Sequence, residues 1–175
     1  MRSWWILVLA VLMLSGCAEL LQVTPYVDPS GGVVFTPETR IRVEIANDGA
    51  YGKIVYTGSG QILSQMIYNS LSKRLRWASM ARKYEDLDSL LDKTDPSEVR
   101  YIVYPTILHW EDRNTPWSRL LDRVNVRIEI IDVELRKTVN SVNIEATNRW
   151  LIFVVNDPPE VLLQKPVEDY VASLF

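Results

Sequence analysis

The sequence predicts an α+β domain in which a mostly antiparallel sheet of about four or five strands packs with one long helix, one short helix and a C-terminal helix. Three observations support this prediction. Apolar and polar residues alternate at 40–46 and again through 122–147, as they do in half-buried strands. Between 61 and 77 the apolar residues recur at helical spacing. The long strands follow one another instead of alternating with helices, which is the element order of an α+β sandwich.

The first half of the domain contains one strand and the long helix. Residues 40–46, RIRVEIA, form the strand, and Asn47-Asp48-Gly49 provides turn residues after it. Ser59 is the expected N-cap of a helix of about four turns. The apolar stripe of this helix consists of Ile62, Leu63, Met66, Ile67, Leu71 and Leu75. Arg74 and Arg76 stand near its C-terminal end, where the helix dipole favours cations.

The second half contains the longer strands. A weak strand at 78–84 and a short helix at 85–93 lead into it. Residues 99–110 carry apolar side chains on both alternating faces, as in a strand that is covered on both sides. Pro105 favours a bulge or an edge position in that strand.

The last elements are a hairpin and a helix. Residues 122–150 predict two strands with one solvated face, and the ELRK segment at 134–137 can turn between them. Residues 160–175 predict a terminal helix that is interrupted or restarted at Pro166.

The first 17 residues, MRSWWILVLAVLMLSGC, have the composition of a signal peptide. Arg2 precedes an uncharged apolar run from Trp4 to Leu14, and this run is shorter than the roughly 20 residues that a membrane-spanning helix needs. The run ends in Leu14-Ser15-Gly16-Cys17, which resembles the lipobox of bacterial lipoproteins. The resemblance implies cleavage between Gly16 and Cys17, a diacylglycerol group on the Cys17 sulfur, and an acyl chain such as palmitate on the freed amine. In such lipoproteins an aspartate after the cysteine favours retention in the inner membrane, so Ala18 favours the outer membrane.

This pattern divides the chain into three parts. Residues 1–16 are a signal peptide that is removed, residues 17–39 are the lipidated cysteine and a flexible tether, and residues 40–175 are a single α+β periplasmic domain. Three prolines and a Gly-Gly pair without sustained periodicity predict the tether, which could reach at most about 70 Å. Residues 33–35 could instead dock as an edge strand.

Composition excludes several functions. The 19 basic and 22 acidic residues give no basic patch for nucleic acid. Since Cys17 is the only cysteine, the domain has no internal disulfide and no cysteine-based zinc site. No cofactor is expected beyond the covalent lipid.

Two motifs of the domain carry a family resemblance. They are DGAYGKIVYTGSG at 48–60 and YIVYPTILHWEDRNTPWS at 101–118. Together with the lipobox they resemble an uncharacterised family of Gram-negative outer-membrane lipoproteins, the domain of unknown function 4823. The element order is also similar to the amino-terminal domain of the Tol-system propeller protein and to curli-secretion and penicillin-binding-protein-activator lipoproteins, a likeness that concerns fold and not function.

The single histidine is the first candidate site residue. His109 and Glu111 are two residues apart on a strand, so they should project from the same face as Ile107, while Trp110 and Asp112 project from the other. A histidine and a carboxylate could act as a general base or as metal ligands. Metal sites usually use three or four protein ligands, however, so neither a metal site nor a catalytic site is predicted. The favoured interpretation is a strand-end cluster whose polar side chains satisfy one another: His109, Glu111, Asp112 and Arg113.

Gly58-Ser59-Gly60 is the second candidate, because amides at a helix start can bind an anion. The segment lacks the spacing of a phosphate-binding loop, and Thr57 and Gln61 stand where a G-x-S-x-G nucleophile motif would need glycines. A tight turn with a helix cap is the favoured interpretation.

Tryptophans are the third group of candidates. Trp110 and Trp150 are expected in the core. Trp117 follows Thr115-Pro116 in a loop and is the candidate for an exposed binding residue.

These features predict a lipid-anchored periplasmic lipoprotein that acts as a non-catalytic interaction or accessory protein for another envelope protein. The alternative is a glycan- or anion-binding module that uses residues 58–60 or Trp117. A hydrolase centred on His109 is a third hypothesis. The sequence leaves the oligomeric state open.

Overall fold

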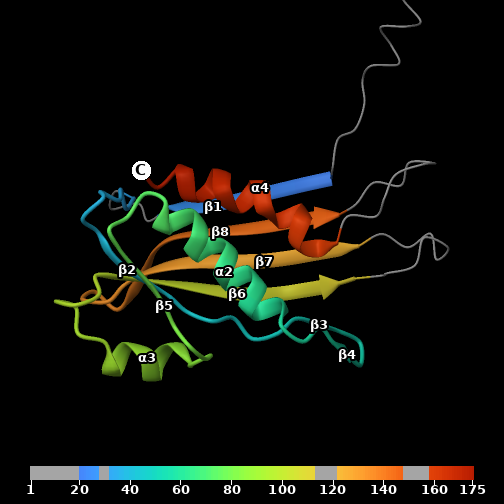
Figure 1. Ribbon diagram of the computed structural model, residues 1–175, viewed down its shortest axis with the longest axis horizontal. Coiled ribbons are helices and arrows are strands. Elements are labelled where there is room, and N and C mark those ends of the chain that lie inside the picture. The colour runs from blue at the N-terminus through green and yellow to red at the C-terminus, as the bar shows by residue number, and fades with distance from the viewer. Residues whose placement is uncertain (1–19, 28–31, 113–121, 148–157) are drawn as a thin grey trace, which may run out of the picture.

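The computed structural model describes residues 20–27, 32–112, 122–147 and 158–175 (Figure 1). Its strands are β1 (Leu20–Val27), β2 (Arg40–Val43), β3 (Ala50–Tyr51), β4 (Ile54–Val55), β5 (Trp77–Met80), β6 (Tyr101–Glu111), β7 (Arg123–Asp132) and β8 (Lys137–Thr147). Its helices are α2 (Ser59–Ser72), α3 (Leu87–Lys93) and α4 (Pro159–Ala172). None of the helices in these described ranges is both long enough and apolar enough to cross a membrane.

The main sheet has six strands in the order β1-β8-β7-β6-β2-β5, and β3 pairs with β4 in a separate hairpin. Strands β1, β8, β7 and β6 are antiparallel neighbours, whereas β2 runs parallel to both β6 and β5. The predicted α+β class with a mostly antiparallel sheet is confirmed, with six strands in place of four or five.

Pro105 occupies a local edge within β6. The parallel ladder with β2 ends where the Glu44 amide donates to the Val103 carbonyl, at 2.9 Å. Pro105 has no N–H with which to continue that ladder, so it pairs only with Ile128 of β7. The expectation of an edge position or a bulge is confirmed in both respects, because a bulge also follows at Leu108, between Ile107 and His109.

Helices α2 and α4 cover one face of the sheet and enclose the main core (Figure 1). The alternating residues of β7 that face them, Val124, Val126, Ile128 and Ile130, are all fully buried. The side chains that meet them from the helices are Leu63, Ile67, Leu71, Leu162, Leu163, Val167 and Val171. The hairpin periodicity read from the sequence is therefore confirmed. The helix stripe is confirmed except at Ile62, which is 44% exposed, and at Leu75, which is buried but lies beyond the end of α2.

A smaller core lies on the opposite face, under α3. It consists of Leu90, Leu91, Ile102, Ile131 and Val133. Ile130 and Ile131 belong to different cores because successive side chains of a strand point to opposite faces of the sheet. Since α3 is short, it covers only one end of this face (Figure 1).

The start and the end of α2 differ from the prediction. Gly58, with φ of 90°, is the N-cap in place of Ser59, whose side chain is turned to a neighbouring loop. The helix ends at Ser72, so Arg74 and Arg76 lie beyond its last turn. Arg74 stacks on the Phe175 ring at 5.7 Å instead.

The prediction that α4 is interrupted or restarted at Pro166 was wrong. The helix continues from Pro159 to Ala172 with Pro166 inside it. Proline removes one backbone hydrogen bond, but the buried stripe that includes Leu163 and Val167 holds both halves of the helix on the sheet.

The prediction that residues 17–39 form a flexible tether was wrong for two parts of that segment. Residues 20–27 form β1, which pairs along its whole length with residues 140–147 of β8. Phe35 is 3% exposed and its amide donates to the Leu174 carbonyl at 2.7 Å. Docking within residues 33–35 is thus confirmed, although the docked residues are not in a strand. Both parts are ordered because each forms backbone hydrogen bonds with the rest of the domain. β1 pairs with the edge of β8, and the Phe35 amide donates to the Leu174 carbonyl.

Candidate functional site

His109 and Glu111 form a contact at the end of β6. His109 Nε2 lies 3.2 Å from Glu111 Oε2, and the Glu111 side chain is only 6% exposed. The ring of Tyr51, on β3, packs edge-on against the imidazole with centroids 5.2 Å apart. The predicted pairing of His109 with Glu111 on one face is therefore confirmed.

The prediction that Ile107 shares this face was wrong. The bulge at Leu108 shifts the register, so that Ile107 pairs with Val126 and His109 pairs with Asn125. Paired residues of an antiparallel ladder lie on the same face, and Val126 belongs to the main core. One extra residue in β6 therefore turns His109 away from Ile107 and toward the opposite, polar face.

The contacts around His109 satisfy these side chains within the protein. In the described ranges no group of three or more histidine, cysteine or acidic residues could hold a metal ion. The Asp112 carbonyl accepts a hydrogen bond from the Tyr56 hydroxyl at 3.4 Å. Arg113, Trp117 and Trp150 lie outside the described residues. At this end of β6 the Glu111 carboxylate is buried, whereas Tyr51 is 44% exposed.

Gly58-Ser59-Gly60 is occupied by contacts within the protein. The Gly60 amide donates to Asp48 Oδ1 at 3.0 Å, and Ser59 Oγ accepts from the Gly49 amide at 2.8 Å. Asp48 therefore supplies the negative charge that the start of α2 attracts. The turn expected here is confirmed, and the amide that would bind an external anion already has an internal carboxylate.

Two glycines let the motif at 48–60 pack against the motif at 101–118. A Cβ on Gly49 would lie 2.4 Å from the Trp110 Cβ, and a Cβ on Gly60 would lie 2.1 Å from the Ala46 carbonyl oxygen. The loop at 46–49 therefore passes between the start of α2 and the end of β6 with no room for a side chain at either glycine. The two motifs meet, and their shared role is close packing.

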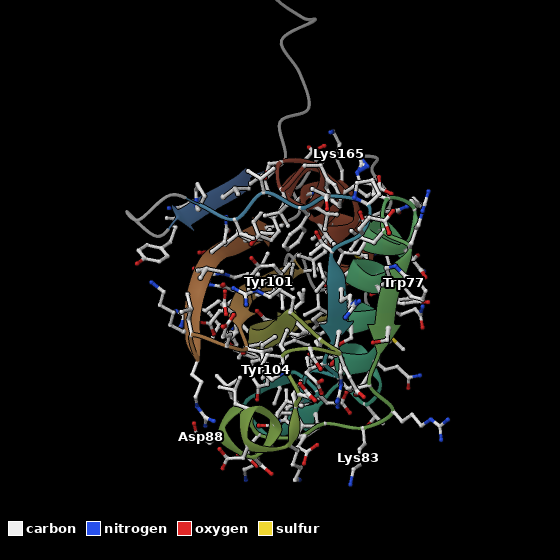
Figure 2. The ribbon with its side chains drawn as sticks, turned by 90° about the vertical axis from the view of Figure 1, so that its left-hand side faces the viewer. Trp77, Lys83, Asp88, Tyr101, Tyr104 and Lys165 are labelled. Carbon is white, nitrogen blue, oxygen red and sulfur yellow. The ribbon has the colours of Figure 1, made fainter. Side chains whose placement is uncertain are left out.

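A second polar cluster was missed from the sequence. Glu44, directly after β2, is 0% exposed, and the Arg42 Nε lies 2.6 Å from its Oε1. The hydroxyl of Tyr104 lies 3.3 Å from both the Tyr84 hydroxyl and the Glu85 carbonyl oxygen, and in Figure 2 Tyr104 lies between the sheet and α3. Alternation in RIRVEIA placed Glu44 on a polar face, but the segment that leads into α3 covers that face.

Burial sets the protonation of this cluster. Burial raises the pKa of Glu44 above the usual range of a glutamate, the Arg42 charge opposes the rise, and the Glu85 charge adds to it. Burial also raises the pKa of the Tyr104 phenol. Glu44 is therefore the carboxyl group of this cluster that most favours its neutral form.

Glu44→Gln is expected to make stability less dependent on pH. A folded-state pKa above the unfolded value means that Glu44 contributes stability fully below a pH of about 4.3, and that this contribution is lost as the pH rises through the folded pKa. The free energy of unfolding of Glu44→Gln minus that of the natural protein should therefore grow as the pH rises from 4 to 8 in urea titrations. The control is Glu98→Gln, at an exposed residue. If the stability difference from the natural protein were independent of pH for Glu44→Gln as well as for Glu98→Gln, the burial argument for Glu44 would be wrong.

The class of protein follows from these observations. It is an α+β sandwich domain with α2 and α4 over one face of a six-stranded sheet and the short α3 over one end of the other face. Its most distinctive sequence motifs pack against each other at one end. The chain belongs to the family described as a domain of unknown function (DUF4823), which matches residues 34–174. The predicted family resemblance is confirmed. Among curated proteins, none has significant sequence similarity to the chain.

Solved structures share the fold. The PelC dodecamer from Paraburkholderia phytofirmans is similar with a TM-score of 0.62 and 16% identity, over 85% of this chain and 96% of that chain. Protein XCC0632 from Xanthomonas campestris is similar with a TM-score of 0.50 and 11% identity, over 84% of this chain and 90% of that one. At these identities the likeness shows a common fold and nothing further.

Proposed function

We propose that the protein is a lipoprotein of the outer membrane, anchored through lipid on Cys17, whose domain binds another envelope protein without catalysing a reaction. The observation that carries this proposal is Leu14-Ser15-Gly16-Cys17, placed directly after an uncharged apolar run. Three acyl chains on one cysteine hold a protein on a bilayer far more firmly than one chain does.

The described site supports binding in preference to catalysis. His109 and Glu111 contact each other, and the ring of Tyr51 packs against the imidazole. The start of α2 is already neutralised by Asp48. The structurally similar PelC is a dodecamer, so a second copy of this chain is one partner that the proposal includes.

Cys17→Ala is the test of the anchor. The variant is expected to lose all incorporation of labelled palmitate and to move from the membrane fraction to the soluble periplasmic fraction, because no sulfur remains to carry diacylglycerol. Ser15→Ala, which keeps a small residue in the lipobox, is the matched control and should retain both properties. Ala18→Asp should remain lipidated but move to the inner membrane. If the natural protein incorporated no labelled palmitate, the proposed anchor would be overturned.

Crosslinking in intact cells followed by mass spectrometry tests the partner. A specific envelope protein, or a second copy of the chain, should be recovered with the natural protein. If only abundant proteins were recovered, with no specific enrichment, the result would argue against a binding function.

A further inference from the structure

We propose that the β3–β4 hairpin contacts the bilayer that holds the lipid anchor, so that the protein is attached to the membrane at two points and held in one orientation. This inference rests on the proposed lipidation of Cys17. It concerns a surface to which the sequence motifs alone assign no role.

The hairpin exposes apolar side chains at its tip. Tyr51 is 44% exposed, Ile54 is 59% exposed and Val55 is 61% exposed. The exposed Lys53 stands between Gly52 and Ile54 in the turn. Gly52 has a φ of 60°, which lets the two short strands reverse direction within two residues. Leu108, the bulge residue of β6, adds a further exposed apolar side chain, 46% exposed.

The register of the sheet places this hairpin at the end of the domain where the anchor enters. Leu20 pairs with Thr147, and Arg123 pairs with both Thr147 and Glu111, so β1 begins at the end of the sheet where β6 finishes. Tyr51 packs against His109 at this same end of β6. Figure 1 shows the start of β1 and the β3–β4 hairpin at one end of the long axis, while the C-terminus lies at the other.

The chain between the lipid and the sheet is short. Leu20 follows Cys17 by three residues, which span at most about 11 Å when fully extended. A lipid on Cys17 therefore keeps the start of β1 within about that distance of the bilayer surface. Strands β8 and β7 lie between β1 and β6 in the sheet. At about 4.8 Å per strand, the end of β6 that holds the hairpin therefore lies only some 15 Å from the start of β1.

The composition of the tip fits a lipid surface. Tyrosine and lysine are residues that place an apolar body in the interface and a polar end in the headgroup layer. Ile54 and Val55, which follow Lys53 in the hairpin, supply exposed apolar area beside these residues. Because the anchor already holds the domain at the surface, the second contact is intramolecular and a small apolar area is enough to keep it.

The test uses the full-length lipoprotein in vesicles of phosphatidylethanolamine and phosphatidylglycerol. Lipid on the Cys17 sulfur leaves no other thiol, so Ile54→Cys gives one site for the fluorophore NBD. NBD emission at residue 54 is expected to rise about two-fold or more on reconstitution, because the fluorophore leaves water. It should be quenched by doxyl-labelled lipid and protected from iodide.

Leu135→Cys is the matched control. Leu135 is 57% exposed, like Ile54, but lies between β7 and β8 at the other end of these strands. NBD at residue 135 should be quenched by iodide and not by doxyl-labelled lipid.

The possible results separate the two proposals. If the unsubstituted lipoprotein reacts with the thiol reagent and does not float with vesicles, the anchor and the hairpin contact are both overturned. If the lipoprotein floats but residue 54 is quenched by iodide as strongly as residue 135, the anchor stands and the hairpin contact is overturned. Protection from iodide without quenching by lipid would assign the hairpin to a protein contact, which also overturns the membrane proposal.

Discussion

Trp110→Ala is expected to lower the free energy of unfolding by about 3–5 kcal/mol, the usual cost of removing a large buried aromatic side chain. Trp110 is 3% exposed and belongs to the main core. The backbone of Gly49 lies so close to it that even a Cβ on that glycine would overlap the Trp110 Cβ. Loss of the indole therefore leaves a cavity under the 46–49 loop, which the rigid strand pairing of β6 with β7 prevents from collapsing.

Trp77→Ala is the matched control for this measurement. Trp77 is 60% exposed on the edge strand β5 and lies at the outer side of the molecule in Figure 2. Its replacement should change the free energy of unfolding by no more than about 0.5 kcal/mol. Urea titrations followed by far-ultraviolet circular dichroism give both values. Equal losses for the two tryptophans would contradict the packing described for β6.

Gly60→Ala is expected to destabilise the fold by about 2 kcal/mol, within the usual range for overpacking. The new Cβ would lie 2.1 Å from the Ala46 carbonyl oxygen, an overlap with backbone that no rotamer change can relieve. Relief requires α2 to move from the 46–49 loop. Such a movement breaks the hydrogen bonds from Gly60 to Asp48 and from Gly49 to Ser59.

The sign of this effect is diagnostic. Within an exposed helix, replacement of glycine by alanine stabilises by about 1 kcal/mol, because alanine has the higher helix propensity. Gln61→Ala, at the next and exposed position of α2, is the control and should leave stability nearly unchanged. A stabilised Gly60→Ala variant in thermal unfolding would mean that α2 is not packed on the loop as described.

These two predictions give the family motifs a physical role. Gly49 and Gly60, in the first motif, pack against Trp110 in the second motif and against Ala46 in the loop that joins β2 to the hairpin. The strongest sequence signatures of the domain therefore hold the β3–β4 hairpin against the end of β6. That placement is also what brings the exposed tip of the hairpin to the end of the domain at which β1 begins.

Most of the secondary structure could be predicted because it depends on local patterns. The alternation of Val124, Val126, Ile128 and Ile130 identifies both the strand and its buried face, since side chains of a strand alternate with period two. The stripe of Leu63, Ile67 and Leu71 does the same for α2 through its helical period. The proline in α4 was misread because tertiary burial on both sides of Pro166 outweighs the local cost of a proline in a helix.

The sequence by itself determined the long strands, the helices, most of their buried residues and the family, because each depends on periodicity or on a short motif. Only the tertiary structure decided three further points. The side of the sheet that His109 faces depends on one bulge residue in β6, and alternation cannot reveal a bulge. Whether residues 20–27 are a tether or a strand depends on β8 offering an unpaired edge far along the chain. The burial of Glu44 depends on the segment before α3 that covers it, which is a contact between parts of the chain that no local pattern relates.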